Sequence, residues 1–274
     1  MTLSEYIKQN VGERFAAIPL DRCRIVKERL IADAPTPLFA VMIEVPYPRR
    51  ERGRVASFAC IPDYHVFFAS FEEDVRRLLE KKYGDVYAKI FSDHSPIDER
   101  RAAAEAGLGV IGDNGLFISE EYGSFVFLGE IILSLSEEEL ESEGIEVRYG
   151  AAGECLHCGL CAAACPAGCI GGDKSSCVSA LTQKKGLLSD TERDIIKRGG
   201  YAWGCDVCAL VCPMNDGKEG KVNDFFKRGA ISPKTFADID AMSDGEYSKY
   251  PFSWRKREVI ARNFGILEKE PSND

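Results

Sequence analysis

The sequence has no hydrophobic run long enough to cross a membrane as a helix, and it has no secretion signal. No stretch approaches about 18 consecutive apolar residues, and the first residues lack a positive segment followed by an apolar one. We therefore expect a cytoplasmic chain without a membrane partner, in a compartment where disulfide bonds are rare. A G-x-G-x-x-G motif after a predicted strand is also absent, so an ordinary dinucleotide site is not indicated.

Positive charge is in short supply. The 274 residues include 35 lysines and arginines against 44 aspartates and glutamates, which gives a formal net charge of −9. A general nucleic-acid binder usually carries the opposite sign, although a local basic patch can remain. Hydrophobic residues make up 45% of the chain, which is enough for one large domain or two smaller ones with a buried core.

Strand-length and helix-length patterns interleave over residues 1–135, which predicts an α+β fold. We expect three parts: a cofactor and substrate domain at 1–145, a cysteine-rich domain at 146–220 and a helical tail at 221–274. The acidic stretch 136–149 is interpreted as a solvated linker rather than an interaction segment, and the last five residues are expected to fray. The expected helices cover 3–14, 63–82 (capped by Asp63 and ended by Gly84), 96–106 and 254–267; the expected strands cover 38–45, 55–61, 86–91 and a hairpin of 116–118 with 125–133.

The cysteines are unevenly placed. Two of the 11, Cys23 and Cys60, lie in the first 154 residues, and the other nine fall between Cys155 and Cys212. The first run has the spacing C-x2-C-x2-C-x3-C-P of bacterial-type [4Fe–4S] ferredoxins, and the second has C-x2-C-x3-C-P. In a reducing compartment such a cluster of cysteines favours metal ligands over disulfides.

Two [4Fe–4S] cubanes need eight thiolates, and the two runs supply seven. Cys177, between them, is the natural eighth; Cys169 is the alternative, and a pair of zinc sites is the alternative to iron. In two-cluster ferredoxins the last cysteine of each run binds the other cluster. The expected ligands are Cys155, Cys158, Cys161 and Cys212 for the first cluster, and Cys165, Cys177, Cys205 and Cys208 for the second.

Four segments carry a family likeness. They are Asp63-Tyr64-His65 before a predicted helix, SDHSPIDER at 92–100 with AGLGVIGDN at 106–114, GSFVFLGEI at 123–131, and the cysteine unit, with CVSALT from Cys177 and GCDVC at 204–208. Through these segments, which span residues 55–215, the chain resembles the epoxyqueuosine reductase family, cobalamin-dependent iron–sulfur enzymes related to reductive dehalogenases.

The resemblance implies a nitroreductase-like α/β domain joined to a two-cluster ferredoxin-like domain, with a base-off cobalamin between them. It implies reduction of the epoxide of epoxyqueuosine in tRNA to an alkene, with electrons from a flavodoxin- or ferredoxin-type donor. It places the general acid at Asp93 and supports Cys177 as the eighth ligand; the alternative for Asp93 is a cap on the helix expected from Pro96. The cofactor contacts it implies are Asp63, Tyr64, His65, Gly109, Gly112, Asn114 and Ser124.

Three departures from the family pattern bear on the expected cofactor and substrate. The family usually has Gly-Lys-Asn-Thr where this chain has Gly112-Asp113-Asn114-Gly115, which reverses a charge near the expected cofactor. Cys60 replaces a family tryptophan and is expected to be a small buried thiol rather than a cofactor contact. Family members continue into helical repeats that help hold tRNA, whereas this sequence stops after what resembles their start.

The ending and the net charge weaken the expectation of a tRNA substrate. A basic group near the end is expected to form a solvated helix face rather than to touch phosphates; it comprises Arg255, Lys256, Arg257 and Arg262. Two alternatives therefore stand beside tRNA reduction. One is the same scaffold acting on a small molecule, and the other is a ferredoxin-like electron carrier without catalysis.

Overall fold

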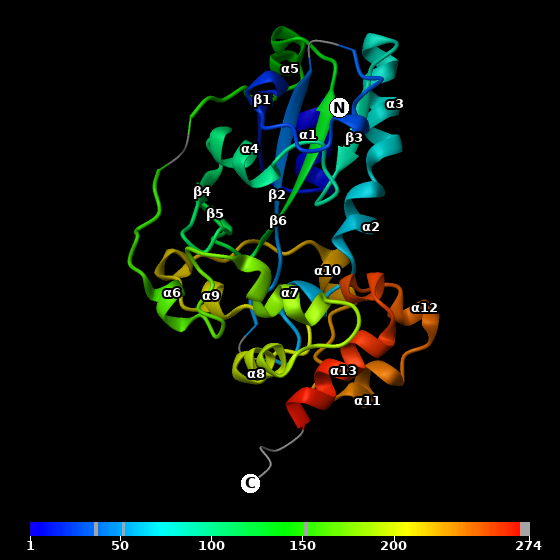
Figure 1. The fold of residues 1–274 in the computed structure, drawn as a ribbon. Coiled ribbons are helices and arrows are strands. Elements are labelled where there is room, and N and C mark those ends of the chain that lie inside the picture. The colour runs from blue at the N-terminus through cyan, green and yellow to red at the C-terminus, as the bar shows by residue number, and fades with distance from the viewer. Residues whose placement is uncertain (36–37, 51–52, 151–152, 269–274) are drawn as a thin grey trace, which may run out of the picture.

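A four-stranded antiparallel sheet forms the centre of the N-terminal half in the computed structural model, which describes residues 1–35, 38–50, 53–150 and 153–268 (Figure 1). The strand order is β1-β2-β6-β3, and β2 and β6 pair along their full length from Phe39 opposite Leu133 to Pro46 opposite Val126. Both central strands are mostly buried on both faces, as continuous apolar runs require. The strands are β1 (Arg14–Pro19), β2 (Phe39–Pro46), β3 (Ala88–Phe91) and β6 (Val126–Leu133), and a separate pair is formed by β4 (Gly109–Ile111) and β5 (Phe117–Ser119).

Helices cover both faces of this sheet. On one face, Val41 and Ile131 pack with residues of the first three helices, and on the other face Met42 and Ile132 pack against the alanines of the fourth. A short helix after β6 is capped by Ser136, so the expected solvated linker is in part a helix whose Leu140 is buried. The helices are α1 (Leu3–Asn10), α2 (Tyr64–Ala69), α3 (Glu72–Tyr83), α4 (Glu99–Glu105) and α5 (Glu137–Ser142).

The cysteine-rich and C-terminal segments form the lower half of the molecule in Figure 1. Most of their helices are short, with α8 and α13 the longer ones, and the two halves meet where α2 descends toward α10. The expected single C-terminal helix is accompanied by three others that the sequence reading missed. The helices are α6 (Leu160–Ala164), α7 (Val178–Gln183), α8 (Asp190–Gly199), α9 (Val207–Leu210), α10 (Asp224–Arg228), α11 (Phe236–Asp240), α12 (Asp244–Tyr247) and α13 (Arg257–Glu268).

Several predicted elements differ from the observed ones. The first helix ends at Asn10 rather than at residue 14, because the chain turns at Gly12 to begin β1, and the helix expected over 63–82 is interrupted between α2 and α3. The strand expected at 55–61 is a single bridge from Val55 to Trp203 followed by a 3-10 turn, Ser57–Cys60. The expected hairpin is also wrong, since β5 pairs with β4 and β6 pairs with β2 and β3.

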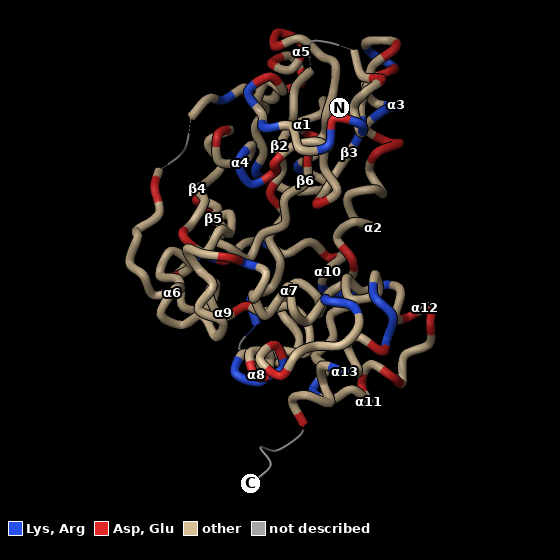
Figure 2. Tube along the Cα trace, in the orientation of Figure 1, with Lys and Arg blue, Asp and Glu red and all other residues tan. Residues whose placement is uncertain are grey.

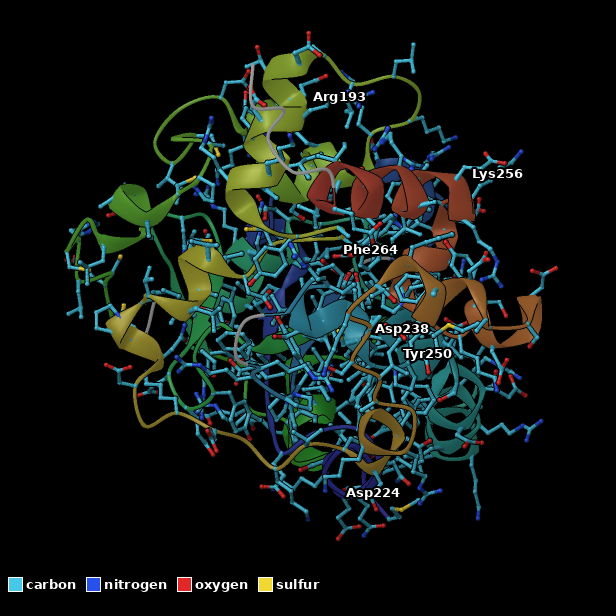
Figure 3. The ribbon with its side chains drawn as sticks, turned by 90° about the horizontal axis from the view of Figure 1, so that it is seen from below. Arg193, Asp224, Asp238, Tyr250, Lys256 and Phe264 are labelled. Atoms are coloured by element: carbon cyan, nitrogen blue, oxygen red, sulfur yellow. The ribbon has the colours of Figure 1, made fainter. Side chains whose placement is uncertain are left out.

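The C-terminal helices pack on residues from both halves. Trp203 is fully buried among Cys60, Phe252 and Phe264, and Phe226 of α10 lies against Phe67 of α2 with ring centroids 4.8 Å apart. Figure 3 shows Phe264 on the inner side of α13 and Lys256 at the outer end of that helix. Hydrophobic packing therefore crosses the expected boundary at residue 220. Residues 270–274, expected to fray, lie outside the described residues.

The basic group on and before α13 is not a solvated face. The Arg257 guanidinium donates to the carbonyls of Ile239 and Met242, both at 2.7 Å, and Arg262 donates to the carbonyl of Lys184 at 2.9 Å. These side chains close the ends of neighbouring helices, which is a common use of arginine near exposed carbonyls. Lys256 alone of the expected group is exposed without such a contact among the described residues.

No helix in the described part of the chain is both long and apolar enough to span a membrane.

Asn263 joins α13 to the cysteine-rich half, and its replacement tests this docking. Its side chain is fully buried, and its amide donates to the carbonyls of Thr182 (2.7 Å) and Ala202 (2.8 Å). We expect Asn263→Ala to lower the free energy of unfolding by about 3 kcal/mol, because two buried carbonyls lose their donor. Denaturant unfolding of the cluster-loaded protein measures this. Glu258→Ala, an exposed site on the same helix, is the control, and equal effects of the two changes would contradict the docking role.

Candidate active site and cluster sites

One small cavity gathers the four cysteines expected for the first cluster. Cys155, Cys158, Cys161 and Cys212 all line it, from two runs about 50 residues apart in sequence. Gly159 enters α6 with a left-handed φ of 74°, and no atom lies within 4 Å of the position of an added Cβ. The open backbone leaves room for a cubane against the loop. Two residues expected to contact the cofactor, Gly112 and Asn114, also line this cavity.

The remaining expected ligands lie in a second group. The charges of Cys205 and Cys177 influence one another, and Cys208 is influenced by Cys177 and Cys165. Burial raises the pKa of the Cys205 and Cys208 thiols to about 12. Such thiols stay protonated in the empty fold, so an iron cation that replaces the proton is the group that stabilises them as thiolates.

Cys169 lies at the edge of this second group. Its sulfur is 3.7 Å from that of Cys165, and burial together with Cys165 and Cys177 raises its pKa to about 11. Cys177 is close enough to influence Cys205, Cys208 and Cys169. Cys177 therefore stays the predicted eighth ligand, with Cys169 as the alternative.

The other two cysteines are small buried thiols, as expected for Cys60. The thiol of Cys60 donates to the Val55 carbonyl at 3.5 Å and that of Cys23 to the Pro19 carbonyl at 3.7 Å. Both are buried beneath their own backbone segments. His157, between two expected ligands, is exposed and pairs with Asp113 through Nδ1 at 2.8 Å. The aspartate that departs from the family pattern therefore contacts the first cysteine loop.

A larger cavity lies between the sheet and the lower half. It consists of two adjoining hollows of about 500 and 510 Å³, and we call the two together the central cavity. Cavities of about 300–1,000 Å³ hold drug-sized or larger ligands. The lower half contributes Gln183, Pro251 and Trp254, and both hollows share the wall residues Tyr47, Tyr64, Asp93, Val126 and Phe127.

Asp93 stands at the mouth of both hollows. Its backbone has a left-handed φ of 60°, which aspartate tolerates better than most residues. Its side chain is 64% exposed, its carboxylate accepts a hydrogen bond from the Tyr64 hydroxyl, and its backbone N–H donates to Glu99 Oε1 at 2.5 Å. It is not a helix cap, because α4 begins at Glu99 and is capped by Asp98.

Tyr64 and His65, from the Asp63-Tyr64-His65 run, lie beside the Asp93 carboxylate. Asp63 caps α2 and also bonds His65 Nδ1 at 2.7 Å, and this hydrogen bond raises the pKa of His65. His65 Nε2 lies 3.8 Å from Asp93. Burial, followed by the Asp93 charge, raises the pKa of Tyr64, so its hydroxyl remains a donor. The run therefore offers Asp93 one neutral donor and one readily charged imidazole.

A buried carboxylate connects this cavity to the second cysteine group. Asp206, between Cys205 and Cys208, accepts from the Ser57 N–H (2.6 Å) and hydroxyl (2.7 Å). Burial raises the pKa of Tyr47, and the charges of Asp206 and Cys208 add to that rise. Tyr47 thus lies between the second cysteine group and the central cavity that it lines.

The central cavity fits a large, mostly apolar cofactor with polar edges. Its second hollow has the apolar wall residues Phe117, Val126 and Leu128. Ser124 lines the same hollow, and its buried Oγ has no hydrogen-bond partner among the described residues. An unpartnered buried hydroxyl beside a cavity is a feature that a polar ligand group would satisfy. Gly109, another expected contact, instead packs in β4, where an added Cβ would lie 2.2 Å from the Ile118 carbonyl.

A further cavity of about 1110 Å³ lies elsewhere. It is formed around the connection from β1 to β2, with wall residues such as Leu20, Ile25 and Leu38. Neither the cysteines expected to hold the clusters nor Asp93, Tyr64 and His65 line this cavity. The chemistry of the side chains therefore points to the central cavity rather than to this apolar groove.

The comparisons with known proteins agree with this geometry. Residues 154–215 match the family described as "4Fe-4S double cluster binding domain". A protein from Cyclobacterium marinum named epoxyqueuosine reductase is 32% identical over 230 residues, which cover 81% of this chain and 71% of the relative. The chain belongs to the epoxyqueuosine reductase family.

Relatives and solved structures extend this finding. An epoxyqueuosine reductase from Staphylococcus aureus is 29% identical, over 84% of this chain, and the match spans 63% of that relative's length. The epoxyqueuosine reductase structure from Streptococcus thermophilus has the same fold, with a TM-score of 0.75 and 23% identity over 96% of this chain and 79% of that one. An epoxyqueuosine reductase solved with an epoxyqueuosine-modified tRNA-Tyr stem loop gives a TM-score of 0.71 and 24% identity over the same shares.

The sequence reading missed several residues of this site. Glu99 lines the central cavity, and Glu130 lies behind it on β6. Both residues lie in the segments that carried the family resemblance. The periodicity of hydrophobic residues does not indicate where an acidic residue has a function. Tyr47 and Trp254 enter the cavity from distant parts of the chain, and no local pattern brings them together.

Exchange of single cysteines tests the ligand assignment. We expect Cys177→Ser to lose the second cluster, so that the iron content per chain falls by about half, because a weakly acidic hydroxyl replaces a thiolate ligand. Cys169→Ser is expected to keep both clusters. Iron analysis and electron paramagnetic resonance of the anaerobically reconstituted proteins measure this, and the reverse pattern would make Cys169 the ligand.

Proposed function

We propose that this chain is an iron–sulfur oxidoreductase that reduces the epoxide of epoxyqueuosine in tRNA to an alkene, with a cobalamin in the central cavity. The observation that carries the proposal is the position of this cavity. It lies between a group of cysteines with ferredoxin spacing and a loop that presents Asp93 to the same space. We infer the class of reaction from the epoxyqueuosine reductase family, to which the chain belongs.

Two [4Fe–4S] clusters, when bound, would supply the electrons for the reduction. Cys155, Cys158, Cys161 and Cys212 would hold the first cluster, and exposed Cys158 would place it near the surface. Cys165, Cys177, Cys205 and Cys208 would hold the second. Cys208 is close enough to Tyr47 to raise its pKa, so the second cluster is the one beside the cavity. A flavodoxin- or ferredoxin-type donor delivers electrons at the exposed end.

Cobalamin, when bound, would supply a redox-active cobalt centre between the second cluster and the substrate. Val126, Phe127 and Leu128 form an apolar wall for its ring, and the Ser124 hydroxyl is available to a polar group at its edge. Tyr47 covers the side that faces the second cluster. Gly112 and Asn114 shape the first cluster's cavity instead.

Asp93 is the general acid for the oxygen that leaves the substrate. Its carboxyl lies at the mouth of both hollows, where the Tyr64 hydroxyl orients it. His65, 3.8 Å away, stabilises the carboxylate after it has released its proton. His65, which is half exposed, returns a proton to Asp93 for the next cycle.

The tRNA substrate approaches at the face that bears Trp254. This side chain lines the central cavity, is 56% exposed, and has the Arg255 guanidinium 3.3 Å above its ring centroid. Exposed aromatic side chains beside a cationic group are typical stacking sites for unpaired bases. Figure 2 shows basic and acidic segments interleaved over the lower half rather than one broad basic face, so base stacking carries more of the recognition than phosphate contacts do.

Conversion of a modified stem loop tests the proposed function. We expect the reconstituted protein, with cobalamin and a low-potential reductant, to convert an epoxyqueuosine stem loop to the queuosine form. Asp93→Asn is expected to slow this by about 100-fold, because an amide cannot act as the acid. Nucleoside mass spectrometry measures the loss of one oxygen atom.

The matched control is Asp85→Asn, since Asp85 is exposed at the other end of β3 and should retain full activity. A wild-type protein that binds both clusters and cobalamin yet leaves the stem loop unchanged would contradict the substrate. A full rate in Asp93→Asn would contradict the acid.

A further inference from the structure

Two carboxyl groups, one half-buried and one fully buried, neighbour Asp93, and the proposed acid step does not use them. Glu99, at the start of α4, lines the second hollow of the central cavity. Glu130, on β6, is fully buried, and its charge is the largest electrostatic influence on Glu99.

No group among the described residues donates a hydrogen bond to the carboxyl group of Glu130. Neither carboxyl oxygen of Glu130 has a hydrogen-bond partner that donates to it among the described residues. Glu99 Oε1 accepts from the Asp93 N–H, so this oxygen is not a donor toward Glu130. Two ionised carboxylates at this depth would repel one another in a medium of low polarity, whereas one proton between them gives both groups a partner.

The charged groups around Glu99 and Glu130 favour a protonated carboxyl group in this pair. Burial, followed by Glu130 and Asp93, raises the pKa of Glu99 well above its ordinary value. Burial raises that of Glu130 to about 7, against a smaller lowering influence of the neighbouring Ser95 and Glu99 side chains. Cys23 and Tyr64 are the other titratable groups that face them, and both are neutral because their own pKa values are raised. Nearby Arg100 directs its guanidinium to the Gly115 carbonyl at 2.6 Å.

We propose that Glu99 and Glu130 share one proton and deliver it through Glu99 to the central cavity, as the second proton of the reduction. This inference rests on the proposed function. Reduction of an epoxide to an alkene breaks both carbon–oxygen bonds, takes up two electrons and two protons, and releases one water molecule. The clusters supply the electrons, Asp93 supplies one proton, and the Glu99–Glu130 pair holds the other within the same cavity wall.

The pair also positions the acid. Because Glu99 Oε1 accepts a hydrogen bond from the Asp93 N–H, the pair is linked directly to the loop that carries the acid. Glu99 contacts the cavity and is a candidate catalytic residue, whereas Glu130 acts through Glu99 and is a positioning residue. Loss of either should therefore have a different kinetic signature.

Infrared spectroscopy of the cluster-loaded protein tests the shared proton without any turnover. We expect a protonated-carboxyl stretch at neutral pH that shifts in deuterium oxide. It should change frequency in Glu99→Gln and in Glu130→Gln and be absent from the double variant. Glu105→Gln, on the same helix with Glu105 paired to Arg101 on the surface at 2.8 Å, should leave it unchanged. A wild-type spectrum in which none of these changes alters such a band would overturn the shared proton.

Stem-loop conversion by the same variants tests delivery. Glu99→Gln should lower the rate about 100-fold, and the double variant should be no slower, since the two residues act as one unit. Glu130→Gln should shift the alkaline limb of the pH–rate profile to lower pH, because the new amide donates to Glu99 and lowers its pKa. A purely structural role for Glu130 would lower the rate equally at every pH and would contradict the proposal.

The two proposals fail in different ways. An active wild type whose rate and pH profile are unaffected by Glu99→Gln overturns delivery by the pair and leaves the proposed function standing. A wild type that shows the carboxyl band but converts no epoxyqueuosine overturns the proposed function together with the delivery step, while the shared proton itself is upheld.

Discussion

The buried hydrogen bonds between Asp206 and Ser57 hold the two halves of the molecule together at the site. Asp206 lies between two cysteines of the second group, and its carboxylate accepts both the N–H and the hydroxyl of Ser57. A buried carboxylate without these donors would cost several kcal/mol, so this contact fixes the second cysteine loop against the segment that leads into Asp63, Tyr64 and His65. The cavity between a pair of cluster sites and a proton donor depends on it.

Around that cavity the protein places acids of different kinds. Asp93 is open to the cavity and held by Tyr64, whereas Glu130 is fully buried and the half-buried Glu99 lies beside it. Burial favours the protonated form of a carboxyl group. Neighbouring carboxyl groups in such different surroundings can release and store protons at the same pH.

The sequence predicted best the features that depend on local spacing. The cysteine runs predicted a two-cluster domain because most ligands of a cubane come from one short loop with fixed spacing, and a match to a double-cluster family over 154–215 bears this out. Features that depend on contacts between distant residues were harder to predict from the sequence. The expected hairpin failed because β6 is paired by β2 and β3 across the sheet, and Asp93 resembled a cap because Asp98 five residues later could not be distinguished from it without backbone angles. The Glu99–Glu130 pair arises only where α4 crosses β6.

The central claim is that the second cluster and the cofactor share one cavity wall, with Tyr47 between them. Electron paramagnetic resonance of cob(II)alamin added to the reconstituted, reduced protein tests it most directly. The account predicts a base-off cobalt signal whose relaxation is accelerated by the nearby reduced cluster, and the loss of that acceleration in Cys177→Ser. A cobalt signal identical to that of free cobalamin in the wild-type protein would contradict it.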